Sequence, residues 1–149
     1  MSAEQNPHAE PQTPDGAAPL SDRELEALNQ VFDLARDGRT EQLAAVLEQG
    51  IPVNLTNANG DTLLILAAYR EQPEVVRLLL ERGADADRLN DRGQTALVCA
   101  VFRNHEPIAR MLLEAGADAS QGHQSPEAVA AFFGLPGMTR LLAEHRGGA

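Results

Sequence analysis

The sequence predicts an all-α protein, an α-solenoid of about four stacked helix-turn-helix units joined by short β-turn or hairpin-like loops. First, Gly50, Gly83 and Gly116 lie 33 residues apart, and each ends a similar apolar run. A constant period of this length indicates an array of small units rather than one globular core. Second, aromatic residues make up only 3% of the chain, whereas Ala and Leu are abundant. That composition favours thin layers of close-packed helices over a sheet.

The N-terminal segment, residues 1–20, is predicted to be a disordered tail. It holds four prolines and few large apolar residues, so it buries too little surface to offset the entropy of ordering. Ser21 is predicted to be a helix N-cap, and Glu24 three residues later completes a capping box. We therefore expect one repeat domain over residues 21–146.

Residues 57–89 and 90–122 align without gaps as two full units. Each begins with a tight turn, continues with a capped short helix, and ends with a second helix stopped by glycine. The landmarks are Gly60, Thr62, Pro73 and Gly83 in one unit, and Gly93, Thr95, Pro107 and Gly116 in the other.

The pattern extends outward in weaker form to residues 24–56 and 121–146. The last unit fits once three residues are removed from its turn, which places Ser125 where the middle units have threonine. Terminal units of stacked arrays are expected to be atypical because one of their faces meets water. We therefore expect four helix pairs.

The segments NGDTLLILAA…EVVRLLLERGADA and RGQTALVCAV…NH…IARMLLEAGADA resemble the ankyrin repeat family. The resemblance covers roughly residues 24–146 and is typical of a small, stand-alone bacterial member. It implies short inner helices forming a concave face, outer helices behind them, and turns that project like fingers. It also implies binding to another protein rather than catalysis.

One departure from the family pattern concerns its Thr-Pro-Leu-His segment. That segment reads Thr62-Leu63-Leu64-Ile65 and Thr95-Ala96-Leu97-Val98 in the two middle units. The histidine's hydrogen-bond network between repeats is therefore absent or replaced by apolar packing.

The first candidate surface follows the small-residue pair of each inner helix. Its members are Arg36, Tyr69, Arg70, Phe102, Arg103, Phe132 and Phe133. Stacking would bring Tyr69, Phe102 and Phe132 into one ridge flanked by arginines, and such side chains are the usual anchors of interfaces. The alternative is that these aromatics only shield the joint between inner helix and loop.

The turn tips form a second candidate surface, with Asn59, Asp61, Arg92 and Gln94 as its members. Loops carry function more often than core positions do. The alternative is that these side chains are simply solvated.

The sequence shows no motif for catalysis, cofactor binding or metal binding, so we expect a protein that is not an enzyme and has no cofactor or metal site. Four histidines without helical ligand spacing and a single cysteine, Cys99, do not make a zinc site. The net charge of −10 disfavours nucleic acid and anionic membranes as partners. The N-terminus lacks signal-peptide features, and we expect a cytoplasmic monomer.

The predicted function is therefore a protein–protein interaction module, an adaptor or regulator that binds a partner protein through its concave face and turn tips. The alternative is an immunity or neutralising protein that blocks a basic toxin or effector, because acidic charge would steer a basic target.

Overall fold

The computed structural model describes residues 21–121 and 124–147. The chain divides into two units between Gln30 and Val31. The described part of the first unit is the beginning of helix α1 (Asp22–Arg36). There the predicted capping box is confirmed, because the Ser21 amide donates to the Glu24 carboxylate at 2.8 Å and the Glu24 amide donates to Ser21 Oγ at 3.1 Å. The predicted tail, residues 1–20, lies outside the described residues.

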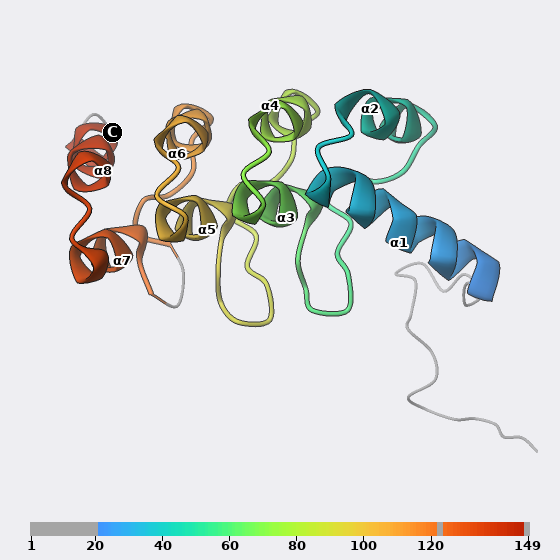
Figure 1. Ribbon diagram of the computed structural model, residues 1–149, viewed down its shortest axis with the longest axis horizontal. Coiled ribbons are helices and arrows are strands. Elements are labelled where there is room, and N and C mark those ends of the chain that lie inside the picture. Colours follow the sequence, from blue (N-terminus) through green and yellow to red (C-terminus); the bar gives the residue numbers. More distant parts are fainter. Residues whose placement is uncertain (1–20, 122–123, 148–149) are drawn as a thin grey trace, which may run out of the picture. The chain divides into compact units, whose positions relative to one another are not determined.

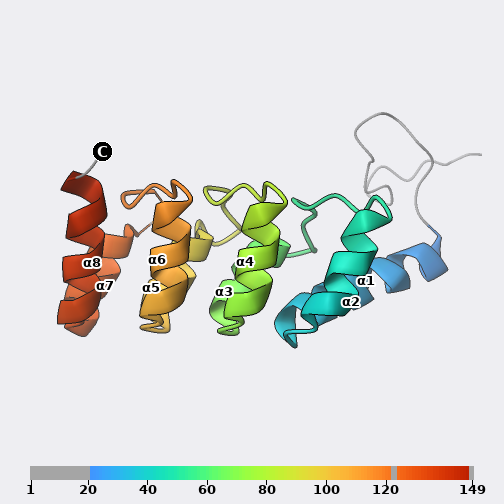
Figure 2. The same cartoon turned by 90° about the horizontal axis from the view of Figure 1, so that it is seen from above.

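The second unit holds the end of α1 and seven further helices in the described residues. These are α2 (Thr40–Glu48), α3 (Leu63–Tyr69), α4 (Pro73–Glu81), α5 (Ala96–Phe102), α6 (Glu106–Glu114), α7 (Pro126–Phe133) and α8 (Pro136–Gly147). Inner helices α3, α5 and α7 form one layer, and outer helices α2, α4, α6 and α8 lie behind them in a second (Figure 1, Figure 2). The described residues contain one isolated β-bridge, Thr56–Thr62, and no strand. The predicted helical solenoid is confirmed.

Each inner helix begins at a hydroxyl side chain that caps it. Thr62, Thr95 and Ser125 accept the backbone amides of Ile65 at 3.0 Å, Val98 at 3.2 Å and Ala128 at 3.1 Å. Each bond satisfies one of the amides that a helix N-terminus leaves without an intrahelical partner. The caps predicted from the repeat, including Ser125 in the shortened unit, are therefore present, and they fix where the inner helices start.

The loop from inner to outer helix passes through a left-handed residue at one position of the repeat. Gly38, Glu71, Asn104 and Gly134 hold that position, with φ of 74°, 59°, 52° and 64°. Glycine adopts this conformation without steric cost, and asparagine tolerates it better than most residues. The repeat alignment did not predict this shared conformation, because two of the four residues are not glycine.

The core lies between the two layers and between neighbouring inner helices. In α5 every residue except Phe102 is buried, and Ala67, Ala68 and Ala100 are fully enclosed where inner helices approach each other. Ile65 and Val98, at the place of the family histidine, are buried with 3% and 5% exposure. Apolar packing therefore replaces the histidine network at these positions. On the outer helices, Leu78 and Met111 are half-buried.

Hydrogen bonds between successive repeats hold the loops in register. Gln72 Nε2 donates to the Arg36 carbonyl at 2.7 Å. On the other side of the stack, the Asp85 amide donates to Asn54 Oδ1 at 2.8 Å, and the Asp118 amide donates to Asp87 Oδ1 at 2.9 Å. The position of each loop is thus set by its neighbour.

Candidate protein-binding groove

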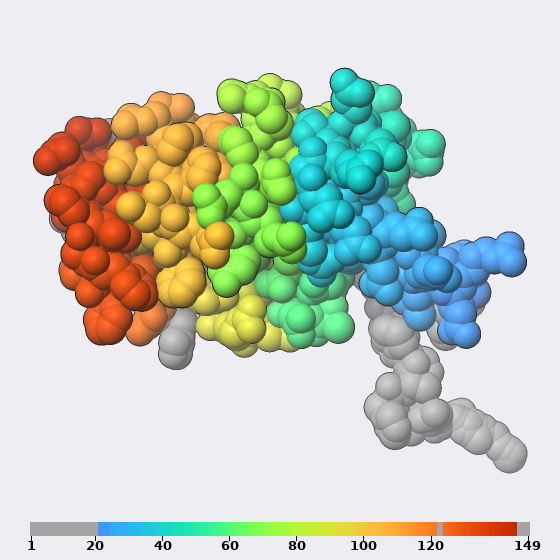
Figure 3. Space-filling view, in the orientation of Figure 1, coloured from blue at the N-terminus to red at the C-terminus, as the bar shows by residue number. Residues whose placement is uncertain are grey.

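Two loops project from the inner side as fingers, the first formed by residues 51–62 and the second by residues 84–95 (Figure 1). They lie side by side in the space-filling view (Figure 3). The Asp91 amide donates to the Asn59 carbonyl at 3.0 Å, so the fingers are joined through their backbones. Together with the inner helices they make one wall of a groove.

The first compartment of this groove has a volume of about 460 Å³. It brings together candidate residues from both predicted surfaces. Arg36 ends α1, whereas Tyr69, Arg70 and Phe102 lie at the ends of α3 and α5. Asn59, Asp61, Arg92 and Gln94 come from the fingers. The two surfaces distinguished in the sequence are therefore one site.

The second compartment has a volume of about 370 Å³ and shares Gln94 and Phe102 with the first. Phe132 and Phe133 line its far end, and Val98 and Val129 lie along it. Among residues 21–121 and 124–147, no charged side chain lines this compartment. Hereafter the groove means the two compartments together.

The four aromatic side chains at the ends of the inner helices form a continuous row. Tyr69 and Phe102 stack with ring centroids 6.4 Å apart, and Phe102 meets Phe133 edge-on at 5.5 Å. The predicted ridge was Tyr69, Phe102 and Phe132, but the ring that Phe102 meets is Phe133, and the Phe132 ring lies edge-on to Phe133 at 5.0 Å. Phe133 occupies the repeat position of Arg70 and Arg103, one residue before the left-handed residue, so this ring contact joins two adjacent positions of the repeat. The ridge is therefore corrected to Tyr69–Phe102–Phe133, with Phe132 at its end.

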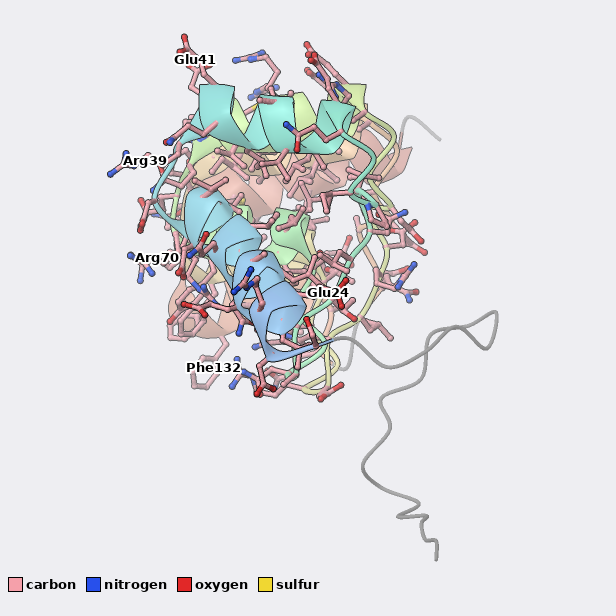
Figure 4. The ribbon with its side chains drawn as sticks, turned by 90° about the vertical axis from the view of Figure 1, so that its right-hand side faces the viewer. Glu24, Arg39, Glu41, Arg70 and Phe132 are labelled. Carbon is pink, nitrogen blue, oxygen red and sulfur yellow. The ribbon has the colours of Figure 1, made fainter. Side chains whose placement is uncertain are left out.

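The exposure of this row is high for aromatic side chains. Tyr69, Phe102 and Phe133 are 43%, 51% and 49% exposed, and Phe132 is 82% exposed. Each of the first three rings packs against one or two neighbouring rings and remains partly in solvent. Arg70 and Phe132 project on the same side of the stack, away from Glu41 of the outer helix α2 (Figure 4).

The arginines of the two candidate surfaces divide into those with an ion-pair partner and those without one. Arg103 pairs with Glu71, with Nη2 2.6 Å from the carboxylate, and its guanidinium lies 5.2 Å from the Tyr69 ring centroid. The hydrogen bond to Glu71 raises the pKa of Arg103 further above its ordinary value. Arg36 pairs with Asp33 at 2.6 Å. By contrast, neither Arg70 nor Arg92 has an ion-pair partner among the described residues.

Asp61 was predicted as an exposed turn tip, and the structure corrects this, because Asp61 is only 6% exposed. Its carboxylate accepts the Asn90 side-chain amide of the next finger at 2.8 Å. Asn90 Oδ1 also accepts the amides of Arg92 and Gln94, both at 2.9 Å. A buried polar group needs such partners, so Asp61 and Asn90 tie the two fingers together. The recurrence of Asn57 and Asn90 at the start of both turns was the sequence signal for this role.

Cys99 lines the floor of the first compartment and is buried. Burial, with a smaller contribution from Asp61, raises the pKa of its thiol to about 12. Only the thiolate is a good nucleophile, so at neutral pH this residue acts as the small apolar side chain that the repeat predicts.

His105 has a structural role, because its Nδ1 accepts the Ile108 amide at 3.2 Å and caps α6. In the described part of the chain no three His, Cys, Asp or Glu side chains gather in a way that could hold a metal ion. Over the same residues no helix combines the length and apolar character needed to cross a membrane. His8 and His123 lie outside the described residues.

Stacked helix pairs with an aromatic groove on their inner face define a repeat-type binding module. A family model described as ankyrin repeats, three copies, matches residues 32–123, which is more than half of the chain. The chain therefore belongs to the ankyrin repeat family, whose repeats generally mediate protein–protein interaction.

A relative from Pseudomonas aeruginosa strain PAO1 carries the name ankyrin repeat protein PA3287. It is 46% identical over 65 residues, which are 43% of this chain and 38% of the relative. The chain thus aligns with less than two fifths of that protein's length.

Proposed function

We propose that this protein is a non-enzymatic adaptor or regulator that binds one partner protein through the groove. It acts by occupying or holding that partner. The observation that carries the proposal is the exposed row of Tyr69, Phe102, Phe133 and Phe132 on the inner face. Burying these rings against a partner would remove apolar surface from water, which is the dominant favourable term in protein association.

A purely structural role accounts for part of this row but not for all of it. Phe102 packs against the rings of Tyr69 and Phe133, and these contacts contribute to packing within the chain. Phe132, however, is 82% exposed and has little to gain from packing within the chain. Exposed apolar patches of this kind mark interaction sites in soluble proteins, and aromatic side chains are enriched among interface hot spots.

The charge of the groove does not favour a basic toxin or effector as the partner at this site. The first compartment is lined by three arginines, Arg36, Arg70 and Arg92, against one aspartate, Asp61. The net charge of −10 therefore resides on other surfaces. A neutralising protein for a basic target would have to use one of those, and the proposal is limited to the groove.

Affinity purification from the source organism tests the proposal when three baits are compared. The baits are the wild type, the triple variant Tyr69→Ala/Phe102→Ala/Phe132→Ala, and the control Leu89→Ala, which truncates a similarly exposed apolar side chain outside the groove. We expect at least one protein to be captured by the wild type and the control and lost from the triple variant, as judged by quantitative mass spectrometry.

Thermal unfolding of the same three proteins must accompany the purification. The triple variant has to remain folded at the temperature of the experiment for its loss of binding to count. Partners captured equally by all three baits would contradict the groove as the binding site.

A further inference from the structure

We propose that the groove takes an extended peptide segment in which one or two carboxylates lie about three residues from a bulky apolar side chain. This inference rests on the proposed function and names the chemistry of the partner at that same site.

The carboxylates are assigned by the charge of the first compartment. Arg70 and Arg92 are exposed and both line it, one at the end of α3 and the other on the second finger. Neither has an ion-pair partner among the described residues, whereas Arg36, Arg82, Arg88 and Arg103 each have one. Guanidinium groups bind carboxylates through paired, charge-assisted hydrogen bonds. Asp61, the acidic side chain among the described residues that line the compartment, is already engaged by Asn90.

The apolar side chain is assigned by the second compartment. It is lined by the aromatic rings of Phe102, Phe132 and Phe133 and by the aliphatic side chains of Val98 and Val129. Gln94 and Gln124 are its polar lining residues, so a charged ligand group would be desolvated there without an opposite charge. A bulky apolar side chain would instead bury its own surface together with that of the rings.

The spacing follows from the repeat. The first compartment lies over α3 and α5 and the second over α5 and α7, so their centres are one helix spacing apart. Packed helix axes lie about 8–10 Å apart, and an extended chain advances about 3.3 Å per residue. The acidic and apolar groups of the ligand are therefore separated by about three residues.

The shared lining also predicts how the two groups act together. A ligand that carries only carboxylates, or only the apolar side chain, fills one compartment and leaves the other solvated. Binding should therefore require both groups on one peptide.

Selection from a phage library of random peptides, using the immobilised full chain, tests this chemistry. We expect the enriched peptides to carry Asp or Glu and, about three residues away, Phe, Leu, Ile, Met or Trp. Fluorescence anisotropy then measures the affinity of labelled synthetic copies for the wild type and for variants. The charge-reversal pair Arg70→Glu/Arg92→Glu should weaken binding by at least about tenfold, and added salt should weaken wild-type binding.

The matched control is Arg77→Glu/Arg110→Glu, which makes the same change in net charge on the outer helices α4 and α6. We expect its affinity to stay within about twofold of the wild type, because outer-helix charges lie away from the groove. If both double variants weakened binding equally, the effect would come from net charge and not from the groove, and the inference would be overturned.

Two further outcomes separate this inference from the proposed function. Peptides that lose binding in Phe102→Ala but are neutral or basic would leave the groove as the binding site and overturn only the acidic ligand. If no selected peptide depended on Phe102 for binding, the result would count against both the acidic ligand and the groove as a binding site.

Discussion

Helices α5 and α7 are the same element of the repeat, yet they bury very different parts of their surface. In α5 six of seven residues are buried, whereas in α7 only Pro126, Val129 and Ala130 are buried. The cause is position, because α5 packs against α3 and α7 while α7 packs against α5 alone within the inner layer. The last unit therefore leaves its terminal aromatics in solvent, where they extend the row that starts at Tyr69. A helix at the end of an array is free to present side chains that a central one must bury.

The largest effect that separates the two regions should come from the central core. Leu97 in α5 is completely buried, so Leu97→Ala should lower the free energy of unfolding by about 2–5 kcal/mol through lost transfer energy and a residual cavity. Leu135, in the loop after α7, is only half-buried, and Leu135→Ala should cost less than about 1.5 kcal/mol. Urea denaturation followed by circular dichroism measures both. Equal losses would show that the last unit is packed as tightly as the centre.

The next effect concerns the fingers, which the last unit lacks in full length. Asn90→Ala removes the partner of the buried Asp61 carboxylate and the acceptor of two turn amides. An unsatisfied buried polar group costs about 1–3 kcal/mol, and we expect a destabilisation in that range. Asn59→Ala, at an exposed tip of the neighbouring finger, serves as the control and should change stability by less than about 0.5 kcal/mol. A similar loss for both would mean that Asn90 does not tie the fingers together.

Helix caps give a smaller contrast. Thr95 is buried and caps α5, whereas Ser125 is half-buried and caps α7. Removing a cap costs about 0.5–2 kcal/mol, and we expect Thr95→Ala near the upper end and Ser125→Ala near the lower end. The same denaturation series ranks them, and the reverse order would contradict the picture of a loosely held last unit.

The smallest effect is expected at the left-handed position after each inner helix. Gly134→Ala places a Cβ in open space, so its cost of about 1 kcal/mol comes from backbone strain alone. Asn104→Gly at the equivalent central position should change stability by less than about 0.5 kcal/mol, since relief of strain is offset by greater freedom of the unfolded chain. Calorimetric melting of the pair provides the measurement. A neutral Gly134→Ala would show that the last loop does not need this conformation.

The sequence was most informative where residues repeat. Glycine stops, hydroxyl caps and small inner residues recur at fixed intervals, and each marks a backbone requirement that only a few residue types satisfy. The helix pairs could therefore be predicted, as could the grouping of the aromatics at one place in the repeat.

The sequence was least informative where contacts join different repeats. The burial of Asp61 depends on Asn90 of the next finger, and the pairing of Arg103 depends on Glu71 of the preceding loop. Phe102 makes its ring contact with Phe133, which stands at the repeat position of Arg103, and not with Phe132, which stands at its own position. Periodicity assigns a position within the repeat but not the side-chain conformations that decide between neighbours. The fusion of two candidate surfaces into one groove is likewise visible only in three dimensions.

Phe102 is the most direct point at which to test the groove as a binding surface, because it lines both compartments and contacts the rings on either side. The decisive measurement is the affinity of Phe102→Ala for a purified partner, made beside its melting temperature. We expect the dissociation constant to rise by about 30-fold, as for an interface hot spot, with only a small change in melting temperature. A melting temperature lowered by several degrees with unchanged affinity would contradict the account and make the aromatic row part of the core.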